Sequence, residues 1–167
     1  MRRSESIIFL DETHPIDALE IVANSEKWEF LRDKDDEISL IIKGSWREYA
    51  LTIIWDQRHD SLSILCSFEM APPKKKLSKL YETLNLVNAD NREGTFVYSS
   101  NENLMLYRNS LFLNDELIIN SSELKIAIMA TISIAEKFYP TFQITCWGDA
   151  MPKEAISVAF GEAAGYA

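Results

Sequence analysis

Residues 136–156 read EKFYPTFQITCWGDAMPKEAI, and this stretch says more about the fold than any other part of the chain. It begins inside an amphipathic helix that we expect to run as far as Pro140. The apolar segment 142–147 follows and ends at Trp147, and its composition predicts a short strand or an extended packing arm. Pro152 then opens a last helix, because proline at the first helical position loses no hydrogen bond that a helix would use.

The composition is that of an ordinary globular domain. The chain has 167 residues, of which 47% are apolar and 26% charged, a balance typical of one compact domain. We expect residues 1–12 to form a loose leader and residues 13–167 a single domain. Seventeen basic residues face 26 acidic ones, for a net charge of −9. Phosphate backbones and anionic lipid repel such a chain, so we predict neither a nucleic-acid partner nor a membrane partner.

Two cysteines, Cys66 and Cys146, lie far apart in apolar surroundings, and we expect both to be buried, inert thiols. The basic start of the chain is followed by only four apolar residues, 7–10. That run is too short for the apolar core of a signal peptide, and nothing approaches the length of a membrane span. The prediction is a cytoplasmic protein.

Hydrophobic periodicity predicts the element order α-β-β-β-β-α-β-β-α-α. We expect helices at 13–25, 77–89, 120–138 and 152–163, and strands at 28–31, 38–42, 46–55, 62–70, 95–98 and 104–113. Apolar and polar residues alternate cleanly in the fourth strand, which indicates an antiparallel sheet with one face in water. Consecutive strands also exclude a doubly wound sheet, so the fold class is α+β.

Several segments in succession resemble one family. They are HPIDAL at 14–19, GSW at 44–46, IW at 54–55, CSF at 66–68, YETLNLVN at 81–88 and the stretch 138–147. Their order and spacing are similar to those of the YbjN family, bacterial sensory transduction regulators, from about residue 13 to the C-terminus. The resemblance implies a fold like that of the type III secretion chaperones, with a twisted antiparallel sheet flanked by helices. It implies a cytoplasmic protein without cofactor or established catalysis, and it supplies no catalytic residues.

Reactive side chains do not gather into a recognisable motif. The acidic turn at 33–37 has no central glycine and is interrupted by Lys34, so it lacks the pattern of a calcium loop and we expect a solvated turn. His59 precedes Asp60, but no nucleophile motif accompanies the pair. His14 is best explained as a residue at a helix start. We therefore predict no catalytic, cofactor-binding or metal-binding residues.

The run Lys74-Lys75-Lys76 is the one basic cluster. We expect it at a helix N-terminus, where positive charges oppose the helix dipole and gain nothing locally. Two interpretations stay open: an ordinary exposed face, or a contact site for an acidic partner.

The third helix is apolar on more than one side. Its main stripe consists of Leu124, Ala127, Ile128, Thr131, Ile134, Ala135 and Phe138, with Ile132 at its edge. Ile126 and Met129 fall well outside this stripe, and a helix with a second apolar side buries that side too. Either the first or last helix covers these two residues, or they form an interface with a subunit or partner.

The tryptophans allow a similar choice. Trp55 lies on an alternating apolar face and is expected in the core. Trp46 begins a predicted strand and Trp147 ends one, so their rings either line the edge of a groove or are partly buried core. The segment beginning at Phe142 would be able to pair with a partner's backbone if its edge were free. The candidate interface is therefore Ile126, Met129, Trp46, Phe142 and Trp147.

Three functions are compatible with these patterns. The first is a non-enzymatic, chaperone-like regulator, dimeric, that holds a segment of a protein partner in an apolar groove. The second is a small-molecule sensor with a pocket between sheet and helices. The third is a hydrolase, which would need His59 or a pair of acidic residues to converge in a pocket with a shifted pKa.

Overall fold

A computed structural model describes residues 14–113 and 120–161, so the expected leader at 1–12 lies outside the described part of the chain. The helices are α1 (Pro15–Glu26), α2 (Leu77–Asp90), α3 (Ser121–Trp147) and α4 (Pro152–Gly161), with a short 3-10 turn, η1 (Lys74–Lys76), before α2. The strands are β1 (Glu29–Lys34), β2 (Glu37–Lys43), β3 (Glu48–Asp56), β4 (Ser61–Glu69), β5 (Thr95–Ser99) and β6 (Leu104–Phe112). This order confirms the predicted one.

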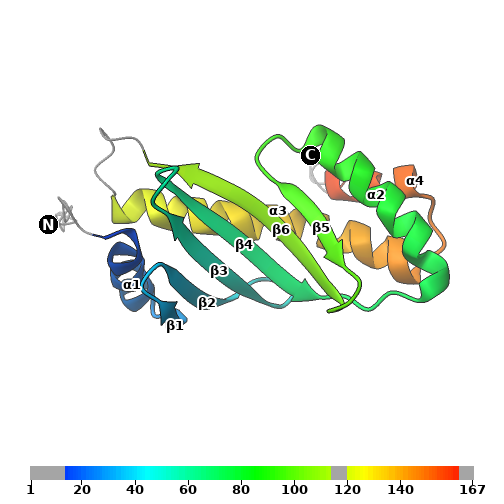
Figure 1. Cartoon of the computed structure of the whole chain (residues 1–167). Coiled ribbons are helices and arrows are strands. Elements are labelled where there is room, and N and C mark those ends of the chain that lie inside the picture. Colours follow the sequence, from blue (N-terminus) through cyan, green and yellow to red (C-terminus); the bar gives the residue numbers. More distant parts are fainter. Residues whose placement is uncertain (1–13, 114–119, 162–167) are drawn as a thin grey trace, which may run out of the picture.

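The six strands form one antiparallel sheet in the order β1-β2-β3-β4-β6-β5. Helix α3 crosses behind the sheet (Figure 1). Helix α1 contacts α3 and also the end of the sheet that β1 and β2 form. Helices α2 and α4 lie together at the other end and pack against the C-terminal half of α3. The predicted class, an α+β fold with an antiparallel sheet and flanking helices, is confirmed.

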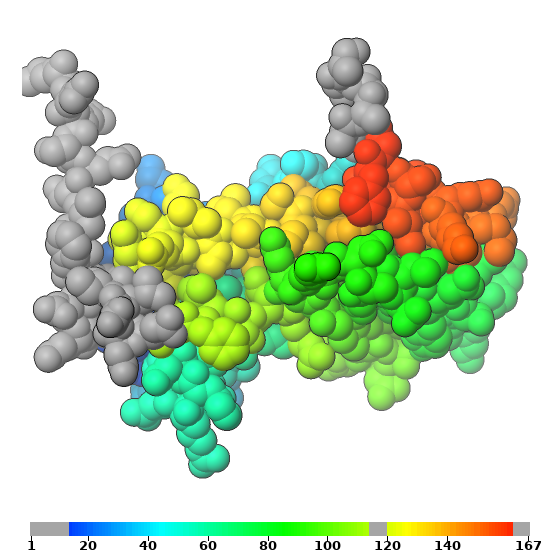
Figure 2. Space-filling model, turned by 90° about the horizontal axis from the view of Figure 1, so that it is seen from above, coloured from blue at the N-terminus to red at the C-terminus, as the bar shows by residue number. Residues whose placement is uncertain are grey.

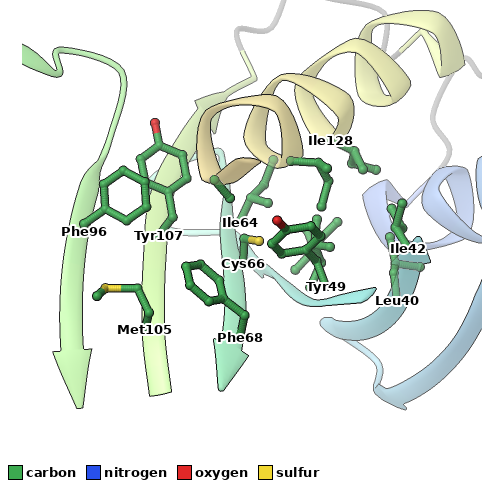
Figure 3. Close-up of a cluster of buried hydrophobic side chains, with 14 of the residues drawn as sticks. Leu40, Ile42, Tyr49, Ile64, Cys66, Phe68, Phe96, Met105, Tyr107 and Ile128 are labelled. Atoms are coloured by element: carbon green, nitrogen blue, oxygen red, sulfur yellow. The ribbon is translucent and has the colours of Figure 1, made fainter. Parts of the chain in front are cut away.

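The core lies between α3 and the sheet face that carries alternate apolar side chains. Tyr49, Cys66 and Phe68 point from neighbouring strands toward the helix, and Ile128 points back from it (Figure 3). Fully burying an apolar side chain of this size contributes about 1.5–3 kcal/mol. The alternation in β4 is confirmed, since Leu62, Ile64, Cys66 and Phe68 are all buried.

The opposite face of the sheet is covered by none of the described helices. Its central rows include small polar side chains such as Ser39, Thr52 and Ser63, which are partly exposed. One face in the core and one open face is the arrangement that the alternating pattern predicted.

The outer edge of β5 is closed by a side chain from α2. The amide of Asn88 accepts a hydrogen bond from the Phe96 backbone N–H at 2.8 Å and donates one to the Phe96 carbonyl oxygen at 2.9 Å. Asn88 thus replaces a neighbouring strand at this position. An edge satisfied in this way is a poor template for pairing with another chain.

Helix α3 runs through Pro140, so the expectation that it ends there was wrong. Segment 142–147 belongs to the same helix and is neither a strand nor an extended arm. A proline inside a helix costs about 3 kcal/mol because it removes one hydrogen bond and crowds the preceding turn. The cost is offset by burial of Phe138, Phe142 and Cys146, which follow one another at helical spacing beneath the sheet.

Both cysteines are free and fully buried, as expected. Burial raises the pKa of the Cys66 thiol to about 12, with a smaller contribution from the negative charge of Glu136. Burial likewise raises the pKa of the Cys146 thiol to about 11. Thiolates are the reactive form of cysteine, so neither residue is a nucleophile at neutral pH.

Candidate protein-binding surface

Helix α3 carries the candidate surface, and both of its ends are fixed by side chains. At the start, the Asn120 side chain accepts a hydrogen bond from the Ser122 backbone N–H at 2.8 Å and so caps the helix. At the end, the Lys76 ammonium group donates to the Gly148 carbonyl oxygen at 2.5 Å. A positive charge at this end favours the helix dipole, so the helix can carry side chains along its full length at fixed spacing.

One side of α3 faces away from the sheet, and we call it the outer face. It consists of Glu123, Ile126, Met129, Ala130, Ser133, Lys137, Pro140 and Trp147, which fall on one side of a helix that turns by about 100° per residue. Ile126 is 67% exposed, Met129 42% and Trp147 50%. Part of this helix lies at the surface in Figure 2, where it is yellow to orange. Neither α1 nor α4 covers Ile126 and Met129.

The turn between β2 and β3 docks against the same helix. The Glu136 carboxylate accepts hydrogen bonds from the backbone N–H groups of Ser45 and Trp46, the latter at 3.2 Å. The Trp46 ring then stacks on Tyr139, with the ring centroids 6.3 Å apart. Trp46 is 56% exposed. Strand β3 begins only at Glu48, so this tryptophan belongs to the turn rather than to the start of a strand.

Three of the five predicted interface residues, Ile126, Met129 and Trp147, therefore lie on the outer face of α3. Trp46 stacks instead on Tyr139, which lies outside that face and also packs against Phe68. Phe142, the fifth residue, is fully buried and packs edge-on against Phe96 at 5.1 Å between ring centroids. It points from α3 into the core, and a residue without exposed surface does not contact a partner. The possibility of a free strand edge at Phe142 disappears with it, since the segment is helical.

We call Trp46, Tyr139 and Trp147 the aromatic ridge. Tyr139 and Trp147 are eight residues apart on α3, about 12 Å along the helix axis. Sequence reasoning missed Tyr139 because it ended the helix at Pro140. The spacing of Tyr139, Gln143 and Trp147 would have placed them on one side of a continuous helix. The contact of Glu136 with the turn has no local sequence signal, since it joins residues about 90 positions apart.

His59 has a carboxylate partner, but the partner is Asp56. The two groups are 2.6 Å apart, and this hydrogen bond raises the pKa of the His59 imidazole. The pair lines an open hollow of about 900 Å³ beside Trp55 and Ser63. Within 14–113 and 120–161, no hydroxyl or thiol donates a hydrogen bond to His59. The nucleophile–base contact that a hydrolase needs is not formed here.

The acidic turn is stabilised by an ion pair and a hydrogen bond between residues of β1 and β2. Lys34 pairs with Glu37 at 2.6 Å, and the Ser39 hydroxyl donates to Asp33 at 2.5 Å. No cluster of three potential metal ligands occurs among the residues that the structure describes.

In the basic cluster, Lys76 closes the end of α3 and also lies 3.6 Å from Asp149. Lys74 and Lys75 are exposed, so two of the three lysines stay available.

A smaller hollow bears on the small-molecule alternative. It measures about 510 Å³ and lies where the ends of α2 and α4 meet α3. Ile134, Phe138 and Phe160 form its apolar wall. Asn91 also lines it, and the buried amide nitrogen of that residue has no hydrogen-bond partner in the described part of the chain. This size is within the range of small-ligand pockets.

None of the described helices is both long and apolar enough to cross a membrane. The described residues define the class of this protein: it is an α+β domain in which one long helix backs a single antiparallel sheet and carries exposed apolar groups on its far side.

Residues 15–143 match the model of the YbjN family, described as "Putative bacterial sensory transduction regulator", and the chain belongs to this family. Its structure is similar to one described as "Crystal structure of YbjN, a putative transcription regulator from E. coli". The TM-score is 0.52 at 8% sequence identity, over 95% of this chain and 96% of the other, which shows a shared fold. A search of curated proteins found no match.

Proposed function

We propose that this chain is a non-enzymatic, cytoplasmic regulator that acts by binding a segment of another protein, in the manner of a chaperone. The observation that carries the proposal is the exposed apolar surface along α3, from Ile126 to the aromatic ridge. The family description, a regulator of sensory transduction, agrees with a role in binding rather than in catalysis.

The aromatic ridge has the properties of a binding hot spot. Tryptophan and tyrosine are the residues most enriched among side chains that dominate binding energy. Trp46 and Trp147 are about half exposed, and Trp147 is the last residue of α3. Glu136 fixes the position of Trp46 through the two backbone hydrogen bonds of the turn, so little side-chain and loop freedom is lost when a partner binds.

The partner's chemistry follows from the surface. A segment that fits the ridge presents aliphatic or aromatic side chains to Tyr139 and Trp147. The chain carries a net charge of −9. This charge attracts basic partners and repels acidic ones at short distances, and dissolved salt screens it at longer ones. The proposed partner is therefore a protein segment with apolar anchors and basic flanking residues.

A second function is supported by the hollow at Asn91. Its apolar wall and its volume suit a small, largely apolar molecule. Native mass spectrometry of the purified protein distinguishes this sensor function from protein binding, because a sensor retains a stoichiometric small molecule.

Affinity capture from the protein's native cells tests the main proposal. We expect the tagged protein to retain one stoichiometric protein partner and Trp147→Ala to lose it. Phe112→Ala is the matched control, because Phe112 is an exposed aromatic residue on strand β6, away from α3. Retention of the partner by Trp147→Ala, or its loss by both variants, would show that the ridge is not the binding surface.

A further inference from the structure

The basic cluster Lys74-Lys75-Lys76 lies beside Trp147, and the proposed function leaves it unexplained. We propose that the partner segment carries acidic residues on one side of its apolar anchor. These acidic residues lie on Lys74 and Lys75 while the anchor packs on Trp147. This inference rests on the proposed function, because it names the chemistry of the partner that the same surface binds.

Lys76 brings the basic cluster to the end of α3. Its side chain is only 15% exposed, and its ammonium group donates to the Gly148 carbonyl oxygen at 2.5 Å. The short turn η1 thus contacts α3, and α4 packs against both α2 and α3. As a result, the start of α2, the end of α3 and the start of α4 meet at one end of the molecule (Figure 1).

Lys74 and Lys75 belong to the same turn but stay available to a partner. Both are exposed, and neither forms an ion pair with a described residue. Their positive charges add to the positive end of the α2 dipole, and the first turn of α2 contains no acidic residue that would offset them. An acidic group of a partner would offset the charge that the described residues leave uncompensated.

Exposed apolar side chains flank the point where Lys76 is anchored. Trp147 directly precedes Gly148, and Met151 follows it three residues later. Trp147 is 50% exposed and Met151 54%. We call this patch the basic corner, which consists of Lys74, Lys75, Trp147 and Met151. Two cations beside apolar side chains are complementary to a segment in which acidic residues adjoin an apolar one.

The charge of the rest of the chain decides which class of partner fits the basic corner. Nucleic acid and anionic lipid present phosphates over a wide area, and a chain with a net charge of −9 repels them. A protein segment brings only a few acidic residues and places them on the basic corner alone. Its basic flanking residues then lie on the other side of the anchor, so the two kinds of charge fix the orientation of the segment.

Selection from a library of random short peptides tests the inference while the natural partner is unidentified. The peptides are displayed on phage and selected on the immobilised full-length protein, and the enriched sequences are compared. We expect aromatic or aliphatic residues with acidic residues on one side of them. On Trp147→Ala, we expect the apolar enrichment to be lost.

Charge reversal separates the basic corner from the overall charge. On Lys74→Glu with Lys75→Glu, we expect the acidic enrichment to be lost. By fluorescence anisotropy, the best wild-type peptide should bind this variant roughly tenfold more weakly, because two exposed attractions become repulsions. Lys74→Gln with Lys75→Gln should give a smaller loss. Arg58→Glu with Arg108→Glu is the matched control, because both arginines are exposed, lie outside α2, α3 and α4, and change the net charge equally.

Two results would overturn the inference. The first is acidic enrichment that persists on Lys74→Glu with Lys75→Glu, or an equal weakening by the control pair. The second is displacement of the selected peptide by a short DNA duplex, which would show that the basic corner binds phosphate backbones instead of protein. Thermal unfolding of each variant checks that the changes in binding do not come from loss of the fold.

Failure of this inference is distinguishable from failure of the proposed function. If the inference alone is wrong, the selected peptides share apolar residues without acidic neighbours, and Trp147→Ala still loses them. If the proposed function is wrong, the selection yields no apolar enrichment that depends on Trp147.

Discussion

At the scale of single residues, the contact between Glu136 and the β2–β3 turn matters most for the candidate surface. The carboxylate satisfies two backbone N–H groups and sets the position of Trp46. Gly44 makes this contact possible, because a Cβ atom there would overlap the Glu136 carboxylate and approach the Tyr49 ring to 2.6 Å. Burial raises the pKa of the Tyr49 hydroxyl, and the negative charge of Glu136 raises it further.

We therefore predict that Gly44→Ala destabilises the protein by about 1–3 kcal/mol, the usual cost of forcing extra atoms into a filled site. Urea unfolding followed by circular dichroism measures the change. Gly161→Ala is the control, since a Cβ atom there meets nothing within 4 Å and alanine suits a helix better than glycine. A Gly44→Ala protein as stable as the wild type would show that the turn does not rest on Glu136.

At the scale of elements, α3 has some features that the sequence could predict and others that it could not. Its buried stripe and the position of Ile126 and Met129 outside that stripe follow from helical periodicity alone. Whether another helix covers these two residues does not follow from it. The alternation in the strands likewise predicted which sheet face is buried. These features depend on neighbours within a few residues, which a sequence pattern records.

The misplaced end of α3 has a physical cause. Proline usually ends or kinks a helix, and that local rule was applied at Pro140. The outcome depends instead on tertiary packing, since Phe138 and Phe142 both contact Phe96 of β5. The roles of Tyr139 and Glu136 could not be predicted for the same reason, because they arise from contacts with a turn that is distant in the sequence.

The two faces of α3 should respond differently to truncation. Phe142→Ala removes a fully buried ring and is expected to cost about 3–5 kcal/mol of unfolding free energy. Trp147→Ala removes a half-exposed ring and is expected to cost about 1 kcal/mol or less. Thermal and urea unfolding of both variants check this. A large loss at Trp147 would mean that its ring supports the fold and not a partner.

At the scale of the whole molecule, the helices are distributed unevenly. Helices α1 and α3 lie on the same side of the sheet, and α2 and α4 support its far end (Figure 1). The outer face of α3 is left without cover from the described helices although α3 supplies much of the core. One face of α3 packs against the sheet and forms the core of the domain. We infer that the other face binds partners.

The most direct test of this account is the oligomeric state of Ile126→Asp combined with Met129→Asp, measured by sedimentation velocity alongside thermal unfolding. We predict that the wild type is a dimer and that the double variant is a folded monomer with an unchanged melting temperature, because both residues are exposed within one copy and are buried only between copies. A double variant that unfolds would contradict the claim that Ile126 and Met129 lie on a surface free for binding, and a wild type that stays monomeric at every concentration would contradict the claim that this surface joins two copies.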